Sequence, residues 1–190
     1  MHRGFSHEHA LWVFVIPTRV VLTVPDIHFH CRRATSHRTA SQVLGAVRQM
    51  ISEHGTSSVT TVGQSLGAAL SLLESMYLRL QLPSTISVKF FGYGLPRVGN
   101  QAWANLVDVK LPGNVTHINN KKDPVPTVPG RSLGYHHPSG EIHIEEAGDW
   151  VVCPGQDNPS TRCIVGTVPN IFVSNETDHD GPYNGIMTLC

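Results

Sequence analysis

The sequence lacks an excess of charge of either sign. Lys and Arg number 14, and Asp and Glu also number 14, so the formal net charge is zero. A basic surface is what draws a protein to nucleic acid or to an anionic membrane, and this balance supplies none. The composition therefore predicts no nucleic-acid partner.

The chain also lacks a long apolar run. The longest run near the start, 11–16, ends at Pro17 and is far short of the roughly 20 residues that a membrane-spanning helix needs. The first ten residues include histidines and a glutamate and show no clear signal-peptide pattern. We predict no transmembrane segment and no export signal in the chain as written.

The chain has few cysteines, which are Cys31, Cys153, Cys163 and Cys190. The middle pair brackets a polar, turn-rich loop of the kind that a disulfide closes, which favours an oxidising compartment. Two unpaired loop thiols in a cytosolic protein are the alternative. N-glycosylation sequons at Asn114 and Asn175 fit a secreted protein, although such triplets are common by chance.

The sequence does contain enough apolar residues for one core. Its 190 residues, of which 40% are hydrophobic, fall within the range of a single domain, so we predict one domain over 1–190. The 12 histidines are spread along the chain rather than set at zinc-site spacing. We expect no metal ion and no other cofactor.

From about Arg38 onward, helices alternate with short apolar strands. Apolar residues at helical spacing predict helices over 43–51 and 66–80. Short apolar or β-branched runs predict strands over 58–62, 86–91, 114–118 and 140–145. This alternation predicts an α/β fold with a mostly parallel sheet flanked by helices.

The strongest motif is Gly63-Gln64-Ser65-Leu66-Gly67, a G-x-S-x-G pentapeptide between a predicted strand and a predicted helix. In such a nucleophile elbow the serine occupies a strained turn, and the glycines are needed because a Cβ would collide with nearby backbone. The helix N-terminus favours negative charge on the reacting oxygen. We predict Ser65 as the nucleophile and the Leu66 N–H as an oxyanion donor.

A serine nucleophile needs a base, and the base needs an acid that orients it. In folds with this elbow the chain order is serine, then acid, then histidine. Asp123 follows a predicted strand and precedes Pro124, so it is a candidate acid; an ordinary Asx-turn before proline is the alternative. The order leaves four candidate bases, His136, His137, His143 and His179. His179 is favoured because its polar loop near the C-terminus could reach the elbow from a separate connection.

At these residues the chain resembles the fungal class 3 lipases, which have the α/β-hydrolase fold. The resemblance covers 38–190 and 1–10 and rests on motifs that occur in the family's order: HRGF, VTTVGQSLGAAL, FFGYGLPRVGN, VTHINNKKDPVPTVP and DHDGPYNG. It implies Ser65 as nucleophile, Asp123 as acid and His179 as base, acting through an acyl-enzyme. The implied substrate is a triacylglycerol or another acyl ester, met at a lipid–water interface, and the implied location is extracellular.

The chain departs from the family pattern in three ways. Gln64 stands where the family usually has histidine, so we expect tuned rather than lost activity. The family's earliest strands, which carry the other oxyanion donor and the lid, should precede HRGF, so we expect a fold incomplete at its N-terminus. Segment 11–37 has no counterpart, and we hypothesise that it is a retained intron read in frame. The alternatives are an inactive or poorly folded lipase fragment, and a feruloyl esterase or phospholipase of the same fold.

Overall fold

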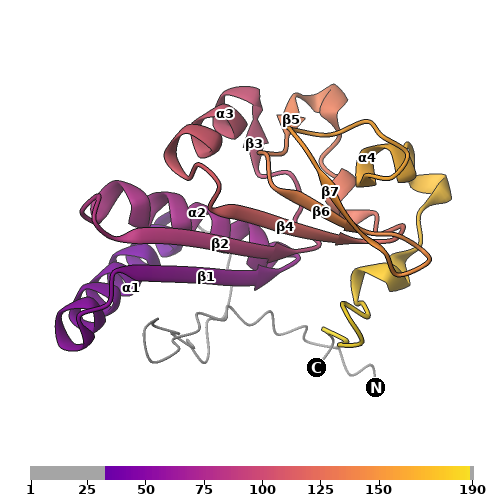
Figure 1. Ribbon diagram of the computed structural model, residues 1–190. Coiled ribbons are helices and arrows are strands. Elements are labelled where there is room, and N and C mark those ends of the chain that lie inside the picture. The colour runs from indigo at the N-terminus through magenta and orange to yellow at the C-terminus, as the bar shows by residue number, and fades with distance from the viewer. Residues whose placement is uncertain (1–32, 189–190) are drawn as a thin grey trace, which may run out of the picture.

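The central feature of the molecule is a five-stranded sheet. The computed structural model (Figure 1) describes the backbone of residues 33–188 and the side chains from residue 40 onward. The strand order is β1-β2-β4-β6-β7, and the first four strands run parallel while β7 is antiparallel to β6. The strands are β1 (Ser58–Gln64), β2 (Ser87–Tyr93), β4 (Val115–Asn120), β6 (Glu141–Ile144) and β7 (Trp150–Cys153). The predicted mostly parallel sheet is confirmed.

Helices connect and cover these strands. Their bounds are α1 (Arg33–His54), α2 (Leu66–Gln81), α3 (Gln101–Lys110) and α4 (Ile164–Thr167). Figure 1 shows α1 and α2 on one side of the strands β1 and β2. A small two-stranded sheet, β3 (Gly99–Asn100) with β5 (Tyr135–His136), lies beside α3. The C-terminal part contains two short 3-10 helices, η3 (Ile171–Val173) and η4 (Glu176–His179).

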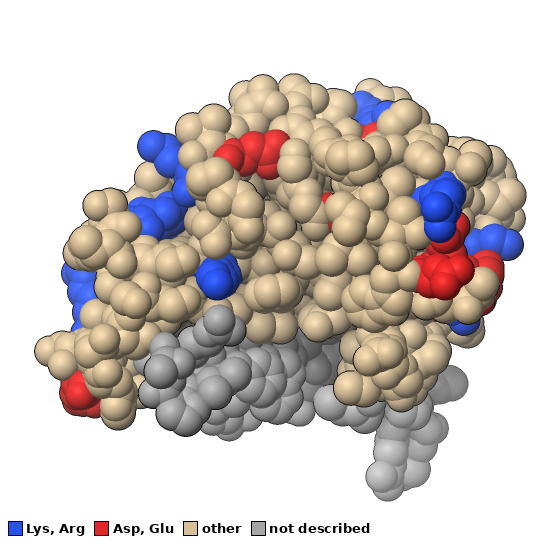
Figure 2. All heavy atoms as spheres, viewed as in Figure 1, with Lys and Arg blue, Asp and Glu red and all other residues tan. Residues whose placement is uncertain are grey.

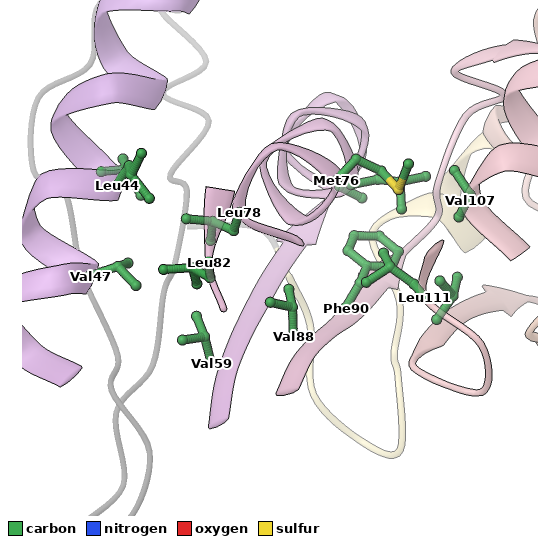
Figure 3. Close-up of a cluster of buried hydrophobic side chains, with 14 of the residues drawn as sticks. Leu44, Val47, Val59, Met76, Leu78, Leu82, Val88, Phe90, Val107 and Leu111 are labelled. Atoms are coloured by element: carbon green, nitrogen blue, oxygen red, sulfur yellow. The ribbon is translucent and has the colours of Figure 1, made fainter. Parts of the chain in front are cut away.

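The core lies between the sheet and the helices α1 and α2. Along β1 and β2 buried and half-buried residues alternate, as a strand's two-residue period requires. Figure 3 shows side chains of α2, such as Met76, facing Val88 and Phe90 of the sheet, while Val47 enters from α1. Burial of these side chains holds α2 against the sheet, and so fixes the turn between β1 and α2.

Several elements of the fold escape the sequence patterns, among them α3 and β7. Helix α3 is only ten residues long and buries only Ala104 and Val107, and the Asn100 side chain caps it by accepting from Trp103 N. Strand β7 is four residues long and exposes much of its side-chain surface. Pairing with β6 and the disulfide at Cys153 stabilise it; the disulfide is predicted from the sequence, whereas the strand pairing is not.

The predicted disulfide is confirmed. Cys153 and Cys163 are joined with an S–S distance of 2.07 Å, which ties the end of β7 to the residue before α4. Among the described helices none is long and apolar enough to span a bilayer. The hypothesised insertion 11–37 lies outside the described residues except for its last five, whose backbone belongs to α1, and it stays a hypothesis.

Charged side chains form no large field of one sign on the face shown in Figure 2. Basic side chains lie along the left of that view, acidic and basic side chains lie together at the right, and a broad, mostly uncharged area separates them. This distribution agrees with the balanced charge of the chain.

Candidate active site

Ser65 lies in a strained turn between β1 and α2. Its backbone has φ 57° and ψ −129°, in a region that non-glycine residues rarely adopt. A Cβ at Gly63 would stand 2.3 Å from the carbonyl oxygen of Gly67, so the strand and helix approach too closely for any other residue there. The Ser65 N–H donates to Tyr93 O at 2.9 Å, which fixes the turn to the end of β2. Strand, tight turn and helix thus stand where the sequence predicts them.

Asp123 and His179 meet although 56 residues separate them in the chain. His179 Nδ1 lies 2.9 Å from Asp123 Oδ2, and the side chains are 15% and 0% exposed. The other carboxylate oxygen, Oδ1, accepts from Val125 N at 2.8 Å. Because Nδ1–H donates to the carboxylate, the lone pair of His179 Nε2 is left as the proton acceptor.

The loop that carries His179 is bound to the end of β4 by several hydrogen bonds. Asn120 Nδ2 donates to Asp178 O at 2.9 Å, and Lys122 N donates to Asp178 Oδ2 at 3.1 Å. Asn175 N donates to Lys122 O at 2.9 Å. These bonds hold η4 against the loop that carries Asp123, so the imidazole and the carboxylate are positioned by one local network.

Tyr183 also stabilises the loop that carries His179. Its hydroxyl donates to His179 O at 3.2 Å, and its ring packs edge-on against Tyr93 with centroids 5.2 Å apart. Burial raises the pKa of Tyr183 far above its usual value. The phenol therefore stays neutral and remains a donor to the backbone of His179.

The side chain of Gln64 contacts the ring of His179. Gln64 Nε2 lies 3.2 Å from His179 Nε2 and donates to His179 O at 3.3 Å. Because Gln64 directly precedes Ser65, these contacts place His179 Nε2 at the elbow. Among the described contacts no hydrogen bond joins Ser65 Oγ to His179, and such bonds are often loose before substrate binds.

Gly94 lies next to the contact between Asp123 and His179. It has φ +55°, and a Cβ built on it would stand 2.8 Å from both Asp123 Oδ2 and His179 Nδ1. Its N–H donates to Ile118 O at 2.9 Å, which fixes its position at the end of β2. The sequence shows a glycine here but not the reason for it.

Two of the other candidate bases have partners elsewhere. His136 Nδ1 lies 3.1 Å from Asp157 Oδ2. His143 is buried, and its two ring nitrogens each lie 2.8 Å from a backbone carbonyl oxygen, those of Arg162 and Lys121. The structure brings neither ring to Asp123.

The remaining candidate, His137, belongs to a buried stack. Its ring lies over that of His117 with centroids 4.9 Å apart and planes 18° apart. Each ring donates one N–H to a backbone carbonyl, His137 to Pro126 and His117 to Pro138. Burial lowers the pKa of both imidazoles, so both are neutral in the native protein.

We expect the free energy of unfolding to fall as the pH is lowered from about 7.5 to about 5. In the unfolded chain His117 and His137 take up protons near pH 6.5, whereas in the native state they do not. The unfolded state therefore binds more protons below that pH, and the stability present above it is lost on acidification. A ring that stays neutral contributes as much as about 2 kcal/mol over this interval.

Urea titrations at the two pH values measure this effect. A His137→Gln variant keeps an amide donor for Pro126 O but cannot titrate, so its pH dependence should be about half as steep. Equal unfolding free energies at both pH values for the unsubstituted chain would contradict the expectation.

Leu66 is the first residue of α2, and its N–H has no acceptor among the described residues. This is the usual condition of an amide in the first turn of a helix, which leaves it available to an anion. The Leu66 side chain is 48% exposed. An oxyanion formed beside Ser65 would find a donor here.

One group of described residues has the spacing of a metal site. Ligand atoms of Glu141, Cys153 and Cys163 lie within 4.8 Å of one another. Both sulfurs are used in the disulfide, and Glu141 Oε1 accepts from Ile164 N at 2.7 Å. Each member of this group therefore already has a structural role.

Comparison with known proteins identifies the family. The family model described as Lipase (class 3) matches residues 7–133. The secreted mono- and diacylglycerol lipase MDL2 of Malassezia globosa is 40% identical over 139 residues, which are 72% of this chain and 44% of that protein. The chain thus spans less than half the length of this relative.

Solved structures show the same fold. Lipase II from Rhizopus niveus matches with a TM-score of 0.69 and 27% identity, over 81% of this chain and 57% of that one. A triacylglycerol lipase whose catalytic centre is described as a serine protease triad matches with a TM-score of 0.66 and 25% identity, over 87% of this chain and 64% of that one. The α/β-hydrolase fold expected from the sequence is confirmed, and the chain belongs to the class 3 lipase family.

Proposed function

We propose that the protein is a carboxylic ester hydrolase that cleaves acylglycerols through an acyl-enzyme on Ser65. One observation carries this proposal: the ring that bonds Asp123 through Nδ1 presents Nε2 at 3.2 Å from Gln64, the residue before Ser65. A serine in a strained turn, an imidazole at that turn and a buried carboxylate behind the imidazole are the parts of a catalytic triad.

In the proposed reaction Ser65 Oγ attacks the ester carbonyl and its proton passes to His179 Nε2. Asp123 stabilises the imidazolium, and the Leu66 N–H donates to the oxyanion. The alcohol leaves with the proton from His179. Water then attacks the acyl-enzyme by the same route and releases the fatty acid, so no cofactor is needed.

Acylglycerols at a lipid–water interface are the substrates that we propose. The support is the name of the relative from Malassezia globosa, a mono- and diacylglycerol lipase, and the exposed apolar side chains of η3, which precedes His179 in the chain. Phe172 of η3, seven residues before His179, is 94% exposed, and Ile171 is 56% exposed. The disulfide and the relative's description as secreted support an extracellular location.

Covalent labelling tests the proposed nucleophile. The purified chain should react with a p-nitrophenyl alkylphosphonate, release p-nitrophenol in a stoichiometric burst and gain the phosphonyl mass on the peptide that contains Ser65. Ser65→Ala should abolish both signals, whereas Ser132→Ala, at an exposed serine, should leave them unchanged. A folded chain that takes up no label would refute the proposal and support the inactive-fragment alternative.

We expect Gln64→Glu to move the acid limb of the kcat/KM profile to higher pH, and so to lower kcat/KM on the acid side of neutrality. The Gln64 amide donates to the lone pair of neutral His179 Nε2, and a carboxylate cannot. The anion instead favours the imidazolium, as the Asp123 carboxylate at Nδ1 already does. A protonated ring cannot accept the proton of Ser65, so activity is lost at a higher pH.

Two further variants make the Gln64 experiment specific. Gln64→Leu removes the donor without adding charge. It should move the acid limb of the kcat/KM profile in the same direction, but less than Gln64→Glu does. Gln101→Glu adds the same charge on α3, where Gln101 is exposed and bonds Asn105, and should move nothing. Profiles that coincide for all the Gln64 variants would show that the contact with His179 has no part in the reaction.

A further inference from the structure

The sequon Asn175-Glu176-Thr177 has no part in the proposed reaction, yet it adjoins the site. It begins directly before η4, the short helix that ends at His179. Asn175 and Thr177 are both exposed. A side chain modified here would project from the surface close to the candidate active site.

The two ends of the Asn175 side-chain amide have different surroundings. Oδ1 accepts from Thr177 N at 3.3 Å and from Thr177 Oγ1 at 2.9 Å, and so caps η4. Nδ2, the atom that N-linked sugars modify, makes no hydrogen bond within the described part of the chain. A sugar on Nδ2 would therefore leave the cap, and with it the loop of His179, unchanged.

The second sequon differs in each of these respects. Asn114 is only half exposed, and its Nδ2 donates to Pro112 O at 3.2 Å. Thr116 lies inside β4, where it pairs with Phe91 of the neighbouring strand. A sugar at Asn114 would have to displace an existing hydrogen bond at the start of a central strand.

We propose that Asn175 carries an N-linked oligosaccharide when the protein passes through a eukaryotic secretory pathway. The proposal rests on the extracellular location proposed above and not on the hydrolase activity. The donor is a lipid-linked oligosaccharide diphosphate. The bond between C1 of the first sugar and the diphosphate oxygen breaks, a bond from C1 to Nδ2 forms, and Nδ2 gives up one proton.

The sugar would change the chemical character of the exposed surface around η3 and η4. Phe172 and Val173, which are exposed, lie within three residues of Asn175. A hydrated oligosaccharide beside these apolar side chains would oppose association of the protein through them. The His179–Asp123 contact would remain as it is, since Asn175 holds this loop through Oδ1 and its backbone N–H.

Expression of the full chain behind a host secretion signal tests the proposal. Peptide mass spectrometry of the secreted protein, before and after enzymatic removal of N-glycans, should show a glycan on Asn175 and its conversion to Asp on removal. Thr177→Val, which destroys the sequon and keeps Asn175, should lose this glycoform completely. Thr177→Ser, which preserves the sequon, should restore it, and Thr116→Val should leave it unchanged.

An unmodified Asn175 in the secreted protein would overturn the proposal, as would a Thr177→Val protein that still carries the glycan at Asn175. The peptide map of the unsubstituted chain decides the question even if a variant fails to fold. Since occupancy is read by mass, the result is independent of whether the protein hydrolyses esters.

Discussion

Replacing Asp123 by asparagine should lower kcat by about 10⁴-fold, as loss of the triad carboxylate does in serine hydrolases of other folds. The structure explains how this would occur. Because Val125 N donates to Oδ1, an amide at this position would keep its oxygen toward Val125 and turn its NH2 toward His179. Nδ1 would then become the acceptor and Nε2 would carry the hydrogen, so the ring could not accept the proton of Ser65.

Initial rates on a soluble p-nitrophenyl ester measure the effect of Asp123→Asn. Asp180→Asn is the matched control, because it makes the same change next to His179 on a carboxylate with no hydrogen bond among the described residues. The control should retain activity within about threefold. An Asp123→Asn protein as active as the control, with a melting temperature close to that of the unsubstituted chain, would remove Asp123 from the proposed triad.

Gly94→Ala should lower kcat/KM by on the order of 10²-fold or more, because a displacement of about 1 Å at catalytic groups has that effect. The added Cβ would stand 2.8 Å from Asp123 Oδ2 and from His179 Nδ1, so the two side chains would have to move apart or away from Ser65. The positive φ adds strain of roughly 1 kcal/mol.

Gly55→Ala separates the two causes. Gly55 has φ +61°, close to the +55° of Gly94, but a Cβ there would meet nothing within 4 Å. It should therefore show the loss of stability from backbone strain without the loss of activity. If the two variants lose equal activity at equal stability, the contact of Gly94 with Asp123 and His179 is not what matters.

The elbow could be predicted from the sequence because all of its causes are local. The glycines, the β-branched strand before them and the helical periodicity after them lie within 58–80, and the structure has β1, the strained Ser65 and α2 there. The order of acid and base narrowed the candidates further. Among the four histidines that the order left, the C-terminal loop and the family resemblance favoured His179, and in the structure His179 is the one that contacts Asp123.

The rest of the site depends on contacts between distant segments. The need for glycine at position 94 comes from Asp123 and His179, which lie 29 and 85 residues later in the chain. Tyr183 likewise owes its position to a distant residue, because its ring packs edge-on against Tyr93, 90 residues earlier in the chain. Local sequence patterns do not encode these contacts, because the contacts depend on which strands lie next to one another in the sheet.

The attachment of η4 to the end of β4 has a consequence for motion in the molecule. Asn120 and Lys122 on one side, and Asn175 and Asp178 on the other, join the two loops into one body. If the C-terminal segment moves, the Asp123 carboxylate and the His179 imidazole move together, so the distance between them is kept. The distance to Ser65 depends instead on the contacts of Gln64 with His179, at 3.2 and 3.3 Å, and on the hydrogen bond that anchors the Ser65 turn to Tyr93.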